Sequence, residues 1–185
     1  MKLSLKRILI WGAGLFAFIA FLFMFGNQLK SVYGSTRTYA SAKDVLFNSD
    51  YSAWLSTVGY FLILLAGGIA VAVSFLVKDE KVQKIVLLVC AGVLFVAAIM
   101  VFAVKGNYKA SMINEAMKEA RKYDMDLKRS EVRAEMNEMF ANIKVTGCPV
   151  FAGIFALMGA AMIAVPMFVK LPDPFAKKGE EPKAE

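Results

Sequence analysis

Four long apolar stretches alternate with polar segments along this chain of 185 residues. They cover about 8–26, 51–77, 85–104 and 149–169, and none contains an Asp, Glu, Lys, Arg or His residue. An α-helix needs about 20 apolar residues to cross the hydrocarbon core of a bilayer. The pattern therefore predicts an all-α fold, in which residues 1–169 form one domain built on a bundle of four transmembrane helices.

The first apolar stretch follows a leader with three positive charges, Lys2, Lys6 and Arg7. A cleaved signal peptide has this layout too, but with a shorter apolar core and a small-residue cleavage site after it. Here the aromatic-rich run 21–25 leads directly into Gly26. An uncleaved first span is favoured, with a signal peptide as the alternative.

The segment 27–50 is polar and rich in turn-forming residues. Ser41 and Asp44 have the spacing of a capping box, which predicts a short surface helix running into Val45. An irregular loop is the alternative. Further along, 78–84 is long enough only for an antiparallel return between spans two and three. The tail 170–185 combines three prolines with alternating charges and is expected to be disordered.

The charged insert 105–147, between spans three and four, shows helical periodicity. Met112, Ala116 and Ala120 recur at four-residue steps, and Val132, Met136 and Phe140 do the same. A continuous helix of about 36 residues would reach roughly 54 Å, yet the chain must return to the membrane. We expect an extramembrane helical hairpin with its break near 124–130, where Ser130 can cap the second helix. The alternative is one long helix lying over the membrane with a late break.

The apolar faces of this insert are rich in methionine, whose flexible thioether side chain adapts to partners. Mutual packing of the two helices and packing on the rim of the bundle would use the same faces. The candidate partner-docking residues are Met112, Met117, Tyr123, Met136, Met139 and Phe140.

Small residues recur within the spans and predict close helix packing, because small side chains let helix backbones approach in lipid. The stripe can serve packing within one bundle or a dimerising face. The candidate packing residues are Ala152, Ala156, Ala160 and Ala164 in the fourth span, and Gly68 and Ala72 in the second.

Composition and charge agree with a membrane protein. Hydrophobic residues make up 58% of the chain, and the net charge of +7 is spread over short segments that flank the spans. The leader and the 78–84 turn each carry three Lys or Arg residues within a few positions. Since cytoplasmic loops carry an excess of positive charge, we expect both termini in the cytoplasm and the insert outside the plasma membrane.

Several kinds of chemistry lack the residues they need. The chain has no histidine, and its two cysteines, Cys90 and Cys148, are far apart in sequence. We therefore expect no catalytic, metal or cofactor site. The spans also lack the ionisable groups that proton relays and ion-coupled transport use. The favoured hypothesis is a non-enzymatic assembly or accessory subunit that self-associates or joins a larger membrane complex and binds no nucleic acid. An oligomeric channel or passive transporter is the alternative.

The order of spans, the basic leader and the Lys78-Asp-Glu-Lys81 turn resemble those of small uncharacterised bacterial four-helix membrane proteins. This resemblance concerns topology and implies no activity. The layout is also similar to that of claudins, but the Trp, Gly-Leu-Trp and paired cysteines of their first outer loop are missing from 27–50.

Overall fold

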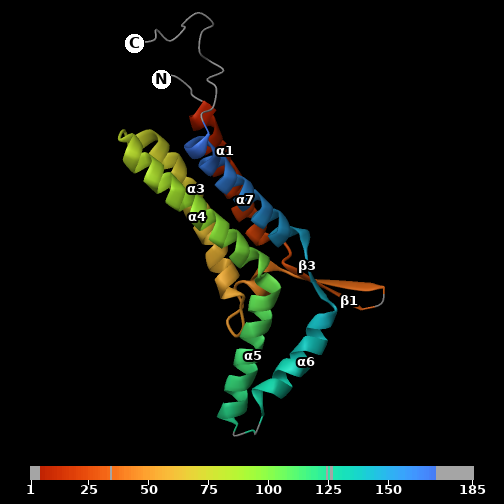
Figure 1. The fold of residues 1–185 in the computed structure, drawn as a ribbon. Helices are drawn as coiled ribbons and strands as arrows, with labels where there is room; N and C mark the ends of the chain where they lie inside the picture. The colour runs from red at the N-terminus through yellow and green to blue at the C-terminus, as the bar shows by residue number, and fades with distance from the viewer. Residues whose placement is uncertain (1–4, 34, 124, 126, 170–185) are drawn as a thin grey trace, which may run out of the picture.

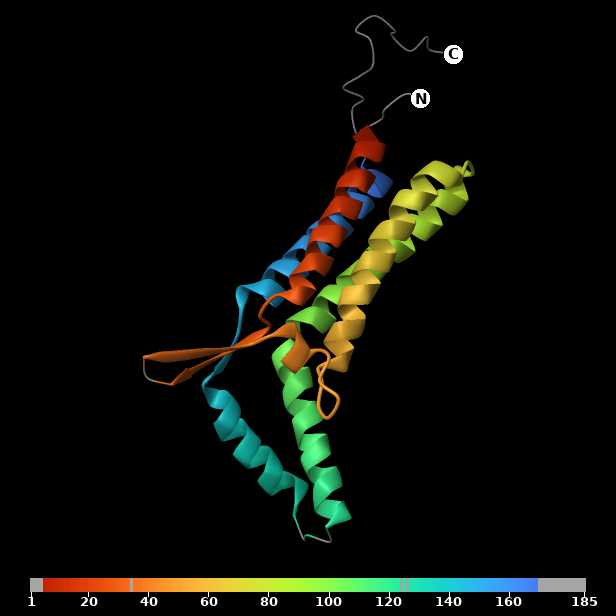
Figure 2. The same ribbon diagram turned by 180° about the vertical axis from the view of Figure 1, so that it is seen from behind.

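The structure is a computed structural model that describes residues 5–33, 35–123, 125 and 127–169. A long four-helix bundle carries a small sheet and two further helices at one end (Figures 1 and 2). The tail 170–185, expected to be disordered, lies outside the described residues.

The bundle consists of α1 (Leu5–Leu22), α3 (Trp54–Leu76), α4 (Glu80–Phe102) and α7 (Gly147–Phe168), with the short helix η1 (Phe23–Phe25) extending α1. All four are long and apolar enough to cross a membrane, as predicted. Helix α4 begins at Glu80 rather than at 85, because the Asp79 carboxylate accepts hydrogen bonds from the Lys81 and Val82 N–H groups at 2.8 and 3.4 Å.

Each bundle helix packs mainly on two neighbours, in the cyclic order α1, α3, α4, α7. Glycines lie at the crossings. A Cβ added at Gly67 of α3 would lie 2.3 Å from the Cβ of Ala17 on α1, and one at Gly59 would lie 3.1 Å from the Ala97 carbonyl of α4. The backbones therefore approach more closely than any side chain at these positions would permit.

The predicted packing residues divide into two groups. Ala152, Ala156 and Ala160 are buried in α7, and Ala164 is half-buried. Gly68 and Ala72 are instead exposed, and a Cβ at Gly68 would have nothing within 4 Å. Among the described residues of α3, it is Gly67, and not the predicted Gly68, that lies in close contact with α1. A packing role for Gly68 and Ala72 stays a prediction that needs a second molecule.

A three-stranded antiparallel sheet, absent from the all-α prediction, lies at the end of the bundle. Its order is β2 (Thr36–Ala40), β1 (Leu29–Tyr33), β3 (Ile143–Val145). Strands of three to five residues carry too few alternating positions to stand out in a polar segment. The capping box is confirmed, since Ser41 N–H donates to the Asp44 carboxylate at 3.0 Å at the start of α2 (Ala42–Val45).

The charged insert contains two helices, α5 (Val104–Lys122) and α6 (Arg129–Ala141), which lie closer together where α5 ends and α6 begins than at their other ends (Figure 1). The cap predicted at Ser130 is wrong, because α6 begins at Arg129 and the Glu131 carboxylate accepts from the Lys128 N–H at 3.4 Å. Their placement outside the bilayer is part of the function proposed below.

Candidate functional site

A groove of about 210 Å³, here called the sheet groove, lies between the sheet and helices α5 and α6. Its walls are mostly apolar and come from segments far apart in the sequence. They are Leu29, Lys30, Ser31, Thr38, Tyr39, Ala40, Tyr108, Met112, Met139, Phe140 and Ile143.

One face of the sheet supplies small and apolar side chains to the groove. Alternate residues of a strand point to the same face. Leu29 pairs with Ala40, and Ser31 pairs with both Thr38 and Ile143, so these five residues share a face. The register places a different set on the other face: Lys30, Tyr39 and Lys144. The groove is therefore bordered mainly by the uncharged face of the sheet, and Lys30 and Tyr39 of the other face also reach its lining.

Helices α5 and α6 supply the aromatic and thioether wall. Phe140 is only 2% exposed, and its ring centroid lies 6.0 Å from that of Tyr108, which packs in turn on Tyr51 at 5.8 Å. Burial raises the pKa of Tyr108, and Tyr51 and Asp44 add to the effect, so the phenol is neutral at ordinary pH. Met139 remains 42% exposed. The wall is thus firm at its base and adaptable at Met139.

Gln28 fixes the sheet to the bundle from a fully buried position. Its Nε2 donates to the carbonyls of Met24 and Gly26 at 2.9 and 3.0 Å, and its Oε1 accepts from the Tyr60 hydroxyl at 3.0 Å. Its backbone N–H also donates to Ala40 at 2.9 Å. One residue therefore joins the end of α1, helix α3 and strand β2. A lone glutamine after an apolar span gives no sequence signal for this role.

Helix α5 is held to the bundle by a second set of polar contacts. Asn107 Nδ2 donates to Ser56 Oγ at 2.9 Å, and the Ser56 hydroxyl donates to the Met100 carbonyl at 2.7 Å. The Ser52 N–H donates to Ser111 Oγ at 3.1 Å. These bonds fix the direction in which α5 leaves the bundle, and with it the helical wall of the groove.

The predicted docking residues are only partly brought together. Met112, Met139 and Phe140 line the sheet groove. The other three, Met117, Tyr123 and Met136, lie outside it, and Tyr123 is 65% exposed. The prediction missed Leu29, Tyr39 and Tyr108, since the sheet itself was not expected.

Helices α5 and α6 do not close on each other along their length. A second hollow of about 390 Å³ separates them and is lined by Lys109, Arg129 and Arg133 among others. Arg129 Nη2 donates to Asn114 Oδ1 at 2.9 Å, and the Lys109 ammonium donates to Asn137 Oδ1. Polar contacts hold the pair together, so mutual packing leaves part of the apolar surface of the insert for the groove.

Among the described residues, no group of three or more His, Cys, Asp or Glu side chains could hold a metal ion. Both cysteines, Cys90 and Cys148, are free. No family model, curated protein or solved structure matches this chain. The interpretation of the sheet groove therefore rests on its own geometry.

Proposed function

We propose that this chain is a non-enzymatic protein of a bacterial plasma membrane that acts as an assembly or accessory subunit, with the sheet groove as its docking site. The observation that carries the proposal is the groove itself, with its apolar lining and its attachment to the bundle through Gln28.

The surface of the bundle supports its placement in lipid. Large apolar side chains cover the outside of α3, where Phe61, Leu65 and Ile69 are 44%, 58% and 47% exposed. Side chains of this kind lower the free energy of a helix in a bilayer and raise it in water. The exposed surface of α5 and α6 is instead rich in Lys, Arg and Glu, which supports a position in the aqueous phase for this pair.

Charge supports an orientation with both termini in the cytoplasm. Lys6 of α1 and Lys78 of the α3–α4 turn line one hollow, so the two short basic segments lie at the same end of the bundle. Positive charge near span ends favours the cytoplasmic side. The sheet groove, at the other end, would then face outward.

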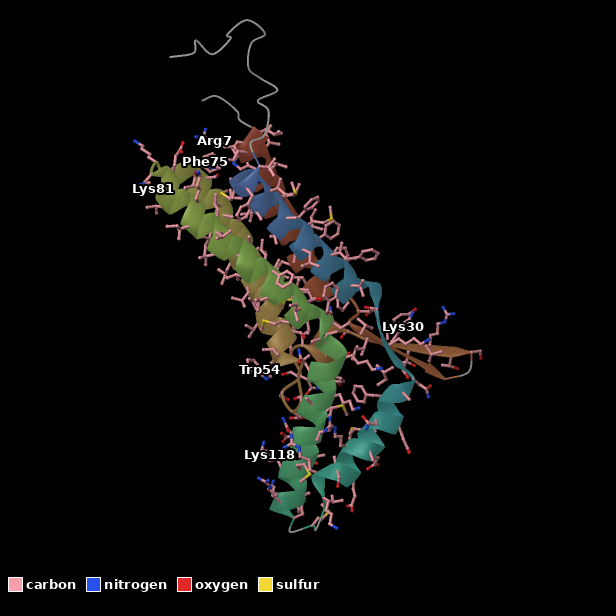
Figure 3. All side chains as sticks on the ribbon, viewed as in Figure 1. Arg7, Lys30, Trp54, Phe75, Lys81 and Lys118 are labelled. Atoms are coloured by element: carbon pink, nitrogen blue, oxygen red, sulfur yellow. The ribbon has the colours of Figure 1, made fainter. Side chains whose placement is uncertain are left out.

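Cysteine labelling tests this orientation. Lys118 on α5 and Lys81 in the first turn of α4 are both exposed and lie at opposite ends of the molecule (Figure 3). On a background in which the two native cysteines are replaced by alanine, a membrane-impermeant thiol reagent should label Lys118→Cys in intact cells and Lys81→Cys only after permeabilisation. Labelling in the reverse order would contradict the proposed orientation.

The geometry favours an extended protein segment as the occupant. At about 210 Å³ the groove is smaller than the roughly 300 Å³ at which small-molecule pockets begin. Strand β2 lies at the edge of the sheet beside the groove. An extended segment can pair with such an edge and place an alternate apolar side chain in the adjoining pocket. We therefore expect a partner strand that pairs with β2 and inserts one apolar side chain between Met112 and Met139.

A charge placed in the groove tests this function. Met139→Lys should reduce the amount of partner recovered in mild detergent by about tenfold or more, because the ammonium would have to be buried without a counter-charge. Tyr123→Lys is the control, since Tyr123 lies outside the groove. Recovery of each partner is measured by quantitative mass spectrometry, with the unfolding temperature as the check on folding. An equal loss in both variants, or no loss in Met139→Lys, would contradict docking in the groove.

Flux measurements separate this function from that of an oligomeric pore. Liposomes that contain the purified protein should be no more permeable to ions or small solutes than empty liposomes, because the apolar stretches 8–26, 51–77, 85–104 and 149–169 contain no Asp, Glu, Lys, Arg or His. A reproducible leak that depends on the protein would overturn the proposal in favour of a channel.

A further inference from the structure

The end of the bundle opposite the sheet has a hollow of its own, here called the basic hollow. Its volume is about 510 Å³, and it lies between the first turns of α1 and the connection from α3 to α4. The proposed docking function makes no use of it. Its lining includes Lys6, Arg7, Ile10, Phe75, Lys78 and Gln83.

The hollow lies beyond the point where α1 and α3 come closest. At that crossing a Cβ added to Gly14 would lie 2.3 Å from a methyl carbon of Val71, and Gly67 meets Ala17 in the same way. Toward this end of the bundle, α1 and α7 stand apart from α3 and α4 (Figure 2). Phe75 lines the space and stacks on Trp11 of α1 with ring centroids 5.2 Å apart.

The polar lining is dominated by cations. Among the described residues, the lining includes Lys6, Arg7 and Lys78 and one carboxylate, that of Glu80. Lys6 Nζ donates to Gln83 Oε1 at 3.2 Å, so α1 and α4 are bridged across the hollow. The two lysine ammonium groups are complementary to an anionic phosphate.

The apolar lining continues toward the outside of the bundle. Ile10, Phe75 and Val77 line the hollow. The neighbouring Leu76 is 78% exposed on the outside of the bundle. Figure 3 shows Arg7 and Phe75 close together at this end, and Lys81 at the start of α4 nearby. Cations above an apolar surface at the ends of membrane-spanning helices lie where phospholipid headgroups lie.

We propose that the basic hollow binds the headgroup of an anionic phospholipid, with the phosphate held between Lys6 and Lys78. The acyl chains follow the surface formed by Phe75 and Leu76. A soluble phosphate has no apolar part that could cover this surface, whereas the acyl chains of a lipid do. We therefore infer a lipid rather than a soluble anion. The site would tie α1 to the α3–α4 connection at the end of the bundle where α1 and α7 stand apart from α3 and α4.

The two tryptophans make a direct test possible, because Trp11 stacks on the wall of the hollow and Trp54 lies at the far end of α3 (Figure 3). A Trp54→Phe variant leaves Trp11 as the single reporter. In nanodiscs with equal mole fractions of brominated lipid, brominated anionic lipid should quench Trp11 at least twofold more than brominated zwitterionic lipid. Equal quenching by the two lipids would overturn the proposal.

Charge variants on that background identify the residues responsible. Lys6→Gln with Lys78→Gln should abolish the preference for anionic lipid, and Lys6→Arg with Lys78→Arg should keep it. Lys81→Gln is the matched control, because Lys81 lies in the first turn of α4, three residues from Lys78, and does not line the hollow. Loss of the preference in Lys81→Gln to the same degree would show a diffuse surface charge and overturn the site.

Inorganic phosphate distinguishes the lipid from a soluble anion. Phosphate added at constant ionic strength should leave the quenching by brominated anionic lipid unchanged. Relief of quenching by phosphate but not by chloride would overturn the assignment to a lipid. None of these readouts depends on the sheet groove, so the two proposals can fail separately.

Discussion

Helix pairs α3–α4 and α5–α6 are each joined by a short connection, yet they are held together in opposite ways. In the first pair the backbones meet at Gly59, where a Cβ would lie 3.1 Å from the Ala97 carbonyl. In the second pair polar side-chain contacts, as between Arg129 and Asn114, stand beside the ring contact between Tyr108 and Phe140, and a hollow of about 390 Å³ separates the helices. Close backbone contact leaves little room for a side chain at the crossing of the first pair, whereas the side-chain contacts of the second pair leave space between the helices. We expect partners to bind beside this second pair, in the sheet groove.

We expect the largest loss of stability from a substitution of Gln28, which joins the bundle to the sheet. Gln28→Leu removes a buried amide and leaves the Met24 and Gly26 carbonyls and the Tyr60 hydroxyl without their partner. We expect a loss of about 3 kcal/mol or more in the free energy of unfolding, measured by denaturant titration in detergent. Tyr60→Phe removes one of these bonds and should cost only about 1 kcal/mol. If Gln28→Leu lowers the free energy of unfolding no more than Tyr60→Phe does, Gln28 does not anchor the sheet to the bundle.

Two adjacent glycines test the close contact in the bundle. Gly67→Ala places a Cβ 2.3 Å from that of Ala17 and should cost about 1–3 kcal/mol of stability. Gly68→Ala meets nothing within 4 Å and should be neutral, or stabilising by up to about 1 kcal/mol. Thermal unfolding of the two variants gives the comparison. If Gly68→Ala leaves stability unchanged but lowers self-association in cross-linking, the predicted dimerising face is supported. Equal destabilisation by the two substitutions would contradict the finding that only Gly67 lies in a close contact.

A smaller effect is expected in the charged pair. Arg129→Ala removes the hydrogen bond to Asn114, and since Arg129 is exposed the loss should be below about 1 kcal/mol. Hydrogen exchange should become faster in α6 and stay unchanged in α4. Faster exchange throughout the bundle would mean that the two regions are coupled more tightly than their contacts indicate.

The smallest effect concerns pH at the capping box of α2. Hydrogen bonds from the Ser41 hydroxyl and N–H hold the pKa of Asp44 below its ordinary value of 3.8. Because the folded-state pKa is depressed, the contribution is complete above 3.8 and is lost as the pH falls through the lower, folded value. Protection of the Ser41 amide against hydrogen exchange, relative to its intrinsic exchange rate, should decrease over that range. Asp44→Asn should remove this pH dependence. An unchanged profile in Asp44→Asn would assign the effect to another group.

The spans were predictable because about 20 uncharged apolar residues have few alternatives to crossing a bilayer. The box at Ser41 and Asp44 was predictable because its contacts are local. The sheet groove was not, since one wall comes from five-residue strands and from β3, which lies more than one hundred positions further along. The β1–β2 hairpin brings Leu29 opposite Ala40, but only pairing with the distant strand β3 brings it opposite Val145.

The stripe of small residues shows a second limit. Alanine spacing correctly marked Ala152 and Ala156 as buried. On α3 the small residues at similar spacing are buried at Ala66 and Ala70 but exposed at the candidates Gly68 and Ala72, and Gly67, which meets α1, was overlooked. A span that is apolar all round does not reveal by composition which of its faces meets another helix.

The most direct test of the sheet groove as a docking site is photo-crosslinking in intact membranes. A photoreactive amino acid replaces Met139 in the groove and, in a second variant, Tyr123 outside it. We expect Met139 to cross-link to a defined extended segment of one partner, identified by peptide sequencing, and Tyr123 to give no such product. Cross-links to the same segment from Tyr123 and none from Met139 would contradict the docking site.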